Sequence, residues 1–308
     1  MKQLPSFKTG GARVETGFVS PDPELNIPFA VIEGEASGPC LLVTAGVHGA
    51  EFCSIEAALR LLRVDPRELR GTIVVLPILN VQGFNRRSIG VMPEDGKNLN
   101  RVFPGSADGS LSERLAAWLV KDVFPKVDAY VDLHGGDLTE EIVPIVLFPA
   151  NDPRSQELAI AFGLPMIVEV PGRGSTIAGG AACGVPSVIV EIGGNGLWTE
   201  DQVTQFTHGI DRILAHLGIK MSEATEGRQT AKQVALQTLS ASAAGIWYPA
   251  KRLSDPVQAG AVLGEVRDAF GAVVATITSE VDGLVLFRLT TLSVNKGETV
   301  FGIGRFVG

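Results

Sequence analysis

Three apolar segments that end in a metal-binding or ionisable side chain constrain this chain more than any other feature. They are residues 46–51, 131–135 and 189–193, and each places a histidine or a glutamate close to glycine. Continuous runs of Val, Ile and Leu are typical of strands that are covered on both faces, as in a parallel sheet. The segments therefore predict polar groups gathered at one end of a buried sheet.

Strands and helices are expected to alternate between residues 27 and about 218. Apolar residues recur at spacings of three and four from Phe52, and capping boxes at Ser110 and Thr199 precede further helical patterns, the last of which stops at Gly218. The predicted strands are residues 29–33, 40–46, 72–79, 129–134, 143–148, 166–170 and 186–192. This alternation predicts an α/β fold with a mainly parallel, mixed sheet flanked by helices.

The last quarter of the chain has a different pattern. We interpret the polar stretch at residues 220–228 as a linker, because short strands punctuated by glycine follow it. These strands are expected near residues 245–247, 263–266, 273–278, 283–287 and 294–298. The sequence thus predicts an α/β domain over residues 1–222 and a small all-β domain, resembling a sandwich or barrel, over residues 223–308.

Two histidines and a glutamate form a candidate metal site. His48 and Glu51 are three residues apart after a predicted strand, so in the first turn of a helix they would face the same way. His134 ends another strand, and ligands of open α/β sheets bind outside the carboxyl ends of strands. Two imidazoles and a carboxylate suit one zinc ion that keeps a position open for water. We therefore predict one Zn²⁺ per chain.

Other residues compete weakly for this role. An H-x-x-E pair also occurs by chance in helices, and only the second strand-end histidine makes the pair informative. Cys53 follows the pair closely and is an alternative ligand or nucleophile, although it lies on an apolar helix face. His208 and His216 lie within a predicted surface helix and are interpreted as solvated or packing residues.

Glu191 is the candidate catalytic base. It interrupts an apolar strand, where a carboxylate is costly unless it meets a cation or metal-bound water. Burial would also raise its pKa and suit it to proton transfer. Glu169 has a similar context and remains an alternative, as does a solvent-facing glutamate on an edge strand. The glycines after Glu191 favour Glu191, because they let a loop open toward a ligand.

A polar, glycine-rich segment at residues 85–105 carries candidate substrate-binding groups. A guanidinium clamps a carboxylate with two parallel hydrogen bonds, so Arg101 beside Asn100 suits a substrate carboxylate. Arg86 or Arg87 would polarise the scissile carbonyl and stabilise the oxyanion. A solvated basic loop is the alternative interpretation of this segment.

Composition limits the partners. The net charge of −8 argues against a nucleic-acid partner. The first ten residues contain no apolar signal-peptide core, and no uncharged apolar run is long enough to span a membrane. The three cysteines share no close spacing and are expected to be reduced, as in a cytoplasmic protein. The oligomeric state stays open, and a homo-oligomer is compatible with the sequence.

The ordered motifs resemble one family. The motifs are H-x-x-E at 48–51, DGKNLNRVFPG at 95–105, DLHG at 132–135 and VEIG at 190–193. Together they resemble the succinylglutamate desuccinylase/aspartoacylase family, which is related to the zinc carboxypeptidases. The resemblance spans roughly residues 25–308, and it implies a zinc carboxypeptidase-like fold with a small β-rich C-terminal module.

The resemblance also implies roles for single residues. His48, Glu51 and His134 would bind zinc, and Glu191 would act as general base and later as proton donor. Asn100 and Arg101 would hold the substrate carboxylate. Arg87 would polarise the carbonyl, and Arg86 is the second candidate for that role. Gly49-Ala50 stands where many members have Gly-Asp or Gly-Asn, a difference expected to change bonding around the metal ligands only.

These expectations lead to three functional hypotheses. The first is zinc-dependent hydrolysis of the amide bond in a small N-acylated amino acid or related compound. The second is a metallocarboxypeptidase that acts on short peptides with the same groups. The third is a binding protein that uses the cleft without turnover. The β-rich module favours the first, because a module that covers the cleft would admit only small substrates.

Overall fold

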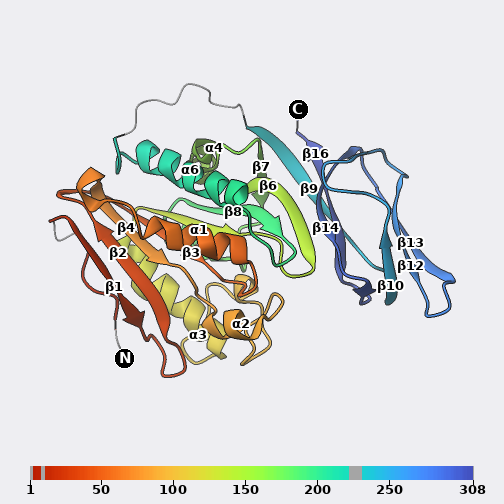
Figure 1. Ribbon diagram of the computed structural model, residues 1–308, viewed down its shortest axis with the longest axis horizontal. Coiled ribbons are helices and arrows are strands. Elements are labelled where there is room, and N and C mark those ends of the chain that lie inside the picture. Colours follow the sequence, from red (N-terminus) through yellow and green to blue (C-terminus); the bar gives the residue numbers. More distant parts are fainter. Residues whose placement is uncertain (1–2, 8–10, 222–230, 308) are drawn as a thin grey trace.

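A mixed β-sheet with helices on both faces forms the centre of the computed structural model (Figure 1). The structure describes residues 3–7, 11–221 and 231–307. The first eight strands are β1 (Arg13–Val19), β2 (Ile27–Glu33), β3 (Ala36–Ala45), β4 (Arg70–Leu76), β5 (Ala129–His134), β6 (Glu140–Pro149), β7 (Met166–Val170) and β8 (Ser187–Gly194). No helix among the described residues is long and apolar enough to cross a membrane.

Parallel pairing governs the middle of this sheet. Strands β4, β3, β5 and β8 lie side by side in that order, and all three contacts between them are parallel. Antiparallel pairs join β1 to β2, β2 to β4 and β6 to β8. The middle strands are almost wholly buried, which is the physical reason for their continuous apolar sequence. The predicted mixed sheet with a mainly parallel centre is confirmed.

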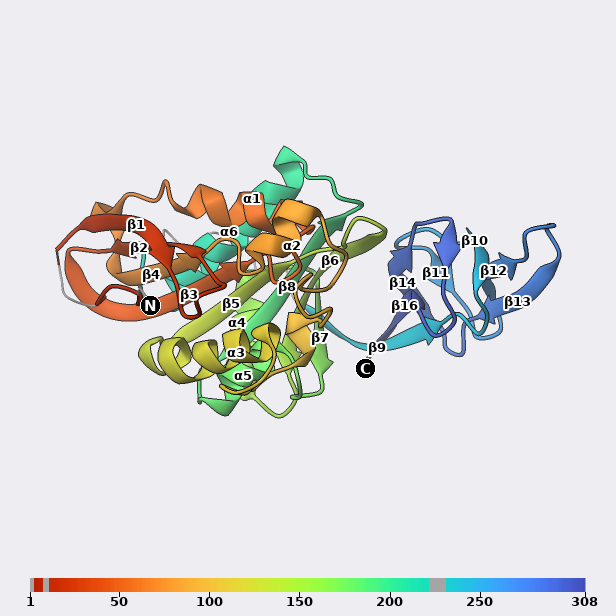
Figure 2. The ribbon, with the colours of Figure 1, turned by 90° about the horizontal axis from the view of Figure 1, so that it is seen from below.

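Helices cover the sheet in two layers. They are α1 (Phe52–Leu61), α2 (Val81–Arg86), α3 (Leu111–Trp118), α4 (Pro153–Phe162), α5 (Thr176–Ala182) and α6 (Glu200–His216). Figure 2 shows α1 and α6 over one face and α3 and α5 over the other. Each face has its own hydrophobic core, one containing Phe162 and Phe206 and the other Phe124 and Tyr130.

The C-terminal strands extend the same sheet. They are β9 (Lys232–Ser240), β10 (Gly245–Pro249), β11 (Pro256–Val257), β12 (Val262–Arg267), β13 (Val273–Thr278), β14 (Gly283–Leu289), β15 (Ser293–Val294) and β16 (Thr299–Phe306). The sheet order is β1-β2-β4-β3-β5-β8-β6-β7-β9-β16-β14-β11, and β14 also pairs with β6. A second, four-stranded sheet in the order β13-β12-β10-β15 packs on the far end (Figure 2).

This continuity joins the predicted C-terminal β domain to the α/β part. Strand β9 pairs in parallel with β7, and Arg288 of β14 pairs with Glu141 of β6, so main-chain and ionic bonds join the two parts. The C-terminal part still has its own core around Trp247 and Phe301. The predicted linker and the boundary at 222/223 fall largely on residues 222–230, which lie outside the described residues.

Local sequence signals placed most elements of the α/β part. Strands β5 and β7 begin and end where the sequence predicts, Ser110 and Glu113 form a capping box, and Thr199 caps α6. Strands β1, β9, β11 and β16 were not predicted, and the strand expected at residues 294–298 was wrong, because β15 ends at Val294 and a turn leads into β16. In β1 and β9 polar side chains occupy many positions, and β1 is an edge strand whose residues alternate between half-buried and exposed. The apolar-run signal is therefore absent there.

The core beneath α6 provides a test of this packing. Phe206 is fully buried between α6 and the sheet, whereas Phe270 in the β12–β13 turn is 97% exposed. Phe206→Ala is expected to lower the free energy of unfolding by about 3–5 kcal/mol, because it leaves a cavity in a close-packed core. Thermal unfolding followed by circular dichroism measures the effect. Phe270→Ala is the matched control, and equal unfolding midpoints for the two variants would contradict this account.

Candidate active site

The candidate site lies where three neighbouring parallel strands end. His48 follows β3, His134 is the last residue of β5, and Glu191 lies near the end of β8. The register places Ala45 opposite Leu133 and His134 opposite Glu191. Parallel strands present their carboxyl ends at one edge of a sheet, where ligands of open α/β folds bind. Chain segments about 140 residues apart are therefore brought together.

The His48–Glu51 pair lies in a turn before α1 rather than in its first helical turn. Helix α1 begins at Phe52, Glu51 is its N-cap residue, and the Glu51 amide bonds the His48 carbonyl oxygen at 3.4 Å. The sequence therefore predicted the proximity of the two side chains correctly but not its cause. A turn serves as well as a helix, because both bring residues i and i+3 together.

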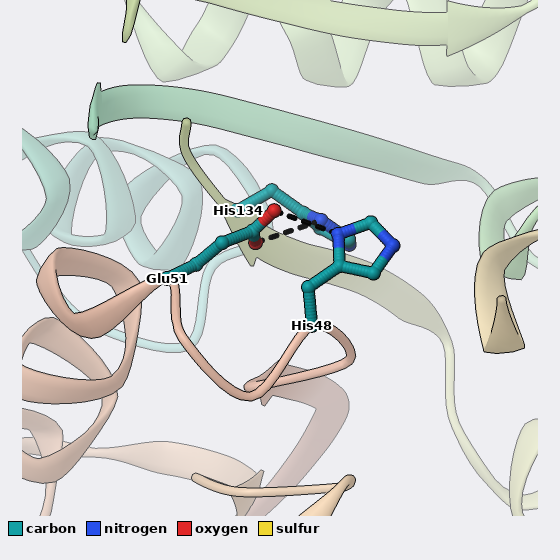
Figure 3. Close-up of side chains that lie close together, drawn as sticks. All are labelled: His48, Glu51 and His134. Atoms are coloured by element: carbon teal, nitrogen blue, oxygen red, sulfur yellow. Dashed lines mark hydrogen bonds and ion pairs between the residues drawn. The ribbon is translucent and has the colours of Figure 1, made fainter. Parts of the chain in front are cut away.

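The two histidines and Glu51 form a compact cluster (Figure 3). Nδ1 of His48 lies 2.7 Å from Glu51 Oε1, and Nδ1 of His134 lies 3.1 Å from Glu51 Oε2. The imidazole rings are 5.1 Å apart and nearly perpendicular. One ligand atom from each of the three residues lies within 4.8 Å of the others. This is the geometry of three protein ligands around a single ion.

Further hydrogen bonds fix which ring nitrogens face the cluster. His134 Nε2 lies 2.8 Å from Asp132 Oδ2, and His48 Nε2 lies 3.1 Å from Asn98 Oδ1. Carboxylate and amide oxygens accept hydrogen bonds, so both Nε2 atoms carry hydrogen and donate. Both Nδ1 atoms then point at Glu51, where each would present a lone pair to a bound ion. Metal-ligating histidines are oriented by such bonds to their other nitrogen.

The donor set suits a zinc ion. Two imidazole nitrogens and a carboxylate oxygen are ligands that zinc accepts, and three protein ligands leave one position free. Although burial opposes its charge, His134 and His48 hold the pKa of Glu51 at about 2. Glu51 Oε2 is buried and makes no hydrogen bond of good geometry. A buried, ionised oxygen without such a bond is expected where a cation binds.

Two glycines are required by close packing around the ligands. A Cβ atom on Gly49 would lie 2.1 Å from the Phe84 amide nitrogen, and one on Gly135 would lie 2.4 Å from the Ile192 carbonyl oxygen. Both contacts involve backbone and leave no room for a side chain. The residue after each histidine of the cluster is therefore glycine for steric reasons.

Glu191 lies beside the cluster and is half-buried. Burial raises the pKa of Glu191 to about 8. The competing Glu169 also lines the cavity, but it is exposed and its carboxylate accepts hydrogen bonds from the Asn151 amide and from Gln233. The register pairs Glu191 with His134, whereas Glu169 belongs to the more distant strand β7. Position and pairing both favour Glu191 as the ionisable group beside the His48–Glu51–His134 cluster.

A cavity of about 580 Å³ opens in front of these residues. His48, Glu51 and Glu191 line it, together with Asn100 and Arg101. The further charged residues that line it are Asp137, Glu140, Glu169 and Arg173. Sequence reasoning missed Asp137, Glu140 and Arg173, since they lie in loops or at a strand start where no periodic pattern marks them.

Two further walls of the cavity come from the C-terminal strands. Leu236 and Thr238 of β9 and Phe287 of β14 line it beside Ile142 of β6. Burial raises the pKa of Glu140, at the start of β6, to about 7. Apolar side chains from the C-terminal strands thus line one part of the cavity, and ionisable side chains such as Glu140 line another.

The structure does not bring every candidate into the cavity. Arg86 and Arg87 are exposed at the end of α2 and are not among the lining residues; Arg86 lies 3.8 Å from Glu94. Their placement gives no support to the roles expected of them. Burial raises the pKa of the Cys53 thiol to about 12, and Cys53 does not line the cavity. That placement argues against Cys53 as a ligand or nucleophile.

Comparison with known proteins places the chain in a family. The family model described as the succinylglutamate desuccinylase/aspartoacylase catalytic domain matches residues 37–217, more than half of the chain. The chain belongs to the succinylglutamate desuccinylase/aspartoacylase family. The resemblance seen in the ordered motifs is thereby confirmed, and the matched residues include His48, Glu51, His134 and Glu191.

Individual relatives agree with this membership. N-alpha-acetyl-L-2,4-diaminobutyric acid deacetylase of Halomonas elongata is 31% identical over 300 residues, covering 91% of this chain and 86% of the relative. The product-bound ectoine utilization protein EutE (DoeB) of Ruegeria pomeroyi has a TM-score of 0.85 at 25% identity, over 94% and 95% of the two chains. A Rhodobacter sphaeroides succinylglutamate desuccinylase/aspartoacylase has a TM-score of 0.86 at 24% identity, over 99% and 98%, which supports the fold.

The cluster geometry of this family member predicts its metal content. Wild-type protein incubated with zinc and then desalted is expected to retain about one equivalent per chain, as three protein ligands suffice for a zinc site. His134→Ala is expected to retain far less, because it removes one of the three ligands. Elemental analysis measures the ratio, and His216→Ala, an exposed histidine on α6, is the matched control. Similar zinc content in both variants would rule out this cluster.

Proposed function

We propose that this protein is a zinc-dependent hydrolase that cleaves the amide bond of a small N-acylated amino acid or a related compound. The observation that carries this proposal is the His48–Glu51–His134 cluster, which lies beside the half-buried Glu191 at one cavity. Family membership and the similarity to a deacetylase support the reaction class. The substrate class of this chain is proposed together with the reaction.

The cluster is the proposed zinc site. His48 and His134 would bind through Nδ1, and Glu51 would bind through its carboxylate. A zinc ion held there supplies a Lewis acid for the substrate carbonyl and lowers the pKa of a bound water toward about 7. The protein's own contribution is to hold the three ligand atoms in place and to keep the surroundings dry.

Glu191 is proposed to move the proton. Its carboxylate accepts a proton from the attacking water and then donates it to the nitrogen of the leaving amine. Burial raises the pKa of Glu191 to about 8, so the side chain can hold a proton near neutral pH. A carboxyl group with an ordinary pKa would be a poorer donor to the amine.

Asn100 and Arg101 are proposed to hold the substrate carboxylate. Both line the cavity, and among the described residues the Arg101 guanidinium bonds only the Asn100 carbonyl oxygen, to which Nη1 donates at 2.8 Å. The remaining guanidinium donors are therefore available to an anion, which they can bind with two parallel bonds. Arg173 brings a second guanidinium to the same cavity. Roles for Arg86 and Arg87 remain predictions from sequence alone.

The shape of the cavity favours deacylation over carboxypeptidase activity. Leu236 and Phe287 of the C-terminal strands stand opposite the α/β part and limit the space in front of the metal ligands. A cavity of about 580 Å³ is within the range of small-molecule sites. An extended peptide would need an open groove instead.

A substrate screen tests the proposal. Zinc-loaded protein is incubated with N-acetyl, N-succinyl and N-formyl amino acids, with N-acetyl-diaminobutyrate included because of the Halomonas relative. Release of the free amine from at least one of these compounds is the expected result. A ladder of short peptides is run in parallel. Cleavage of the peptides alone would favour a carboxypeptidase, and zinc binding without any hydrolysis would favour a binding protein.

Loss of the proton carrier is the first mutational prediction. Glu191→Gln is expected to lower kcat by about 10²–10⁴, the usual contribution of acid–base catalysis, because the amide cannot accept the proton. The zinc content should stay at the wild-type ratio, since Gln replaces no ligand. Glu169→Gln is the matched control and should keep most of the activity. Near-normal turnover in Glu191→Gln would end the assignment of Glu191.

The carboxylate clamp gives a second mutational prediction. Arg101→Lys keeps the charge but removes the two-pronged geometry, so kcat/KM is expected to fall about 10–100-fold, equivalent to a charge-assisted hydrogen bond of about 1.5–3 kcal/mol. Steady-state kinetics on the substrate found in the screen measure the change. Arg86→Lys, on the exposed end of α2, is the control. Equal kcat/KM values for the two variants would contradict a role for Arg101 in binding the substrate carboxylate.

A further inference from the structure

A buried hydrogen-bond network lies beneath the cavity and connects two of its functional groups. Thr44, Asp132 and Thr176 are fully buried. Thr44 Oγ1 donates to Asp132 Oδ1 at 2.5 Å, and Thr176 Oγ1 donates to Asp132 Oδ2 at 2.5 Å. The same Oδ2 accepts the Nε2 hydrogen of His134 at 2.8 Å. Asp132 thus receives three hydrogen bonds in the dry interior.

Counting protons leaves one arrangement for this network. Each threonine hydroxyl has a single hydrogen, and an ionised carboxylate only accepts. Both threonine hydrogens are therefore used on Asp132, and the Tyr130 hydroxyl, 2.7 Å from Thr44 Oγ1, is the donor in that contact. His134 then has no choice of ring nitrogen: Nε2 carries hydrogen and Nδ1 faces Glu51.

The backbone of Thr176 orients a second residue. Its amide N–H donates to Asn100 Oδ1 at 2.9 Å, whereas its hydroxyl, already committed to Asp132, lies 3.4 Å from the same oxygen. The Asn100 amide therefore points its oxygen into the protein. Asn100 Nδ2 has no hydrogen-bond partner among the described residues, and Asn100 lines the cavity. The NH₂ group is left to donate to a ligand.

We infer that Thr176 is a positioning residue that orients the metal ligand His134 through its hydroxyl and the substrate-binding Asn100 through its backbone N–H. This inference rests on the proposed function, because it gives Thr176 its role through a zinc ligand and a substrate contact. Thr176, at the start of α5, would thereby orient both the metal ligand and the residue that contacts the substrate carboxylate.

The two arms of Thr176 are separable by mutation. Thr176→Val has nearly the same shape and keeps the backbone N–H, so it removes only the bond to Asp132. Asp132 then loses one of its donors and holds His134 less firmly. Mutations of groups that orient a metal-ligating histidine cost about 10–100-fold in metal affinity. Asn100→Asp instead replaces the NH₂ donor with an oxygen that repels a substrate carboxylate.

Zinc affinity measured by competition with a chromophoric chelator tests the hydroxyl arm without any need for turnover. Thr176→Val is expected to bind zinc about 10–100-fold more weakly than wild type, and Thr176→Ser, which restores the hydroxyl, to stay within about threefold of wild type. Thr72→Val is the matched control, since Thr72 is also fully buried but its hydroxyl has no hydrogen-bond partner in the described part of the chain. Its zinc affinity should not change.

Kinetics test the backbone arm. Asn100→Asp is expected to raise KM at least tenfold at unchanged zinc affinity, and Thr176→Val is expected to lower zinc affinity with a smaller change in KM once zinc is saturating. A purely structural role for Thr176 would lower the unfolding midpoint and leave zinc affinity as in Thr72→Val, which would overturn the inference. Failure of the wild-type protein to bind zinc would overturn the proposed function instead, so the two outcomes are distinct.

Discussion

Parallel hydrogen bonding between β3, β5 and β8 creates the site, because it fixes the relative position of three segments that are distant in sequence. The register places His134 opposite Glu191, and the end of β3 leads into the turn that holds His48 and Glu51. A shift of one residue in any of these strands would turn its side chains to the other face of the sheet. The apolar cores on both faces, formed by different helices, oppose such a shift.

The ionisable groups at this edge stay stable because each has a defined partner. Burying a carboxylate without compensation is costly, and Asp132 is fully buried. Two threonine hydroxyls and His134 satisfy Asp132, while the two imidazoles compensate Glu51. Glu191 meets its burial in another way, since its pKa rises to about 8 and it can remain neutral. The same desolvation that costs stability thus suits the side chain to proton transfer.

The C-terminal strands belong to the site as well as to the fold. Because β9 and β14 join the main sheet through β7 and β6, they place Leu236 and Phe287 against the cavity with main-chain precision. A module attached by a flexible linker alone could not hold such a wall in place. The size of the cavity is therefore connected to strand pairing more than 90 residues away from His134.

The sequence by itself determined most strands and helices of the α/β part, because periodicity and capping residues are local properties of the chain. Its ordered motifs also determined the family and the candidate residues His48, Glu51 and His134. The sequence favoured Glu191 over Glu169 as the candidate catalytic base. The strand order, which the sequence does not contain, supports the same residue. Only the tertiary structure placed Arg86 and Arg87 on the surface, brought Asp137, Glu140 and Arg173 into the cavity, and joined the C-terminal strands to the main sheet. Those features depend on the path of loops and on long-range pairing between strands, and the energies that decide them come from contacts between residues that no local pattern connects.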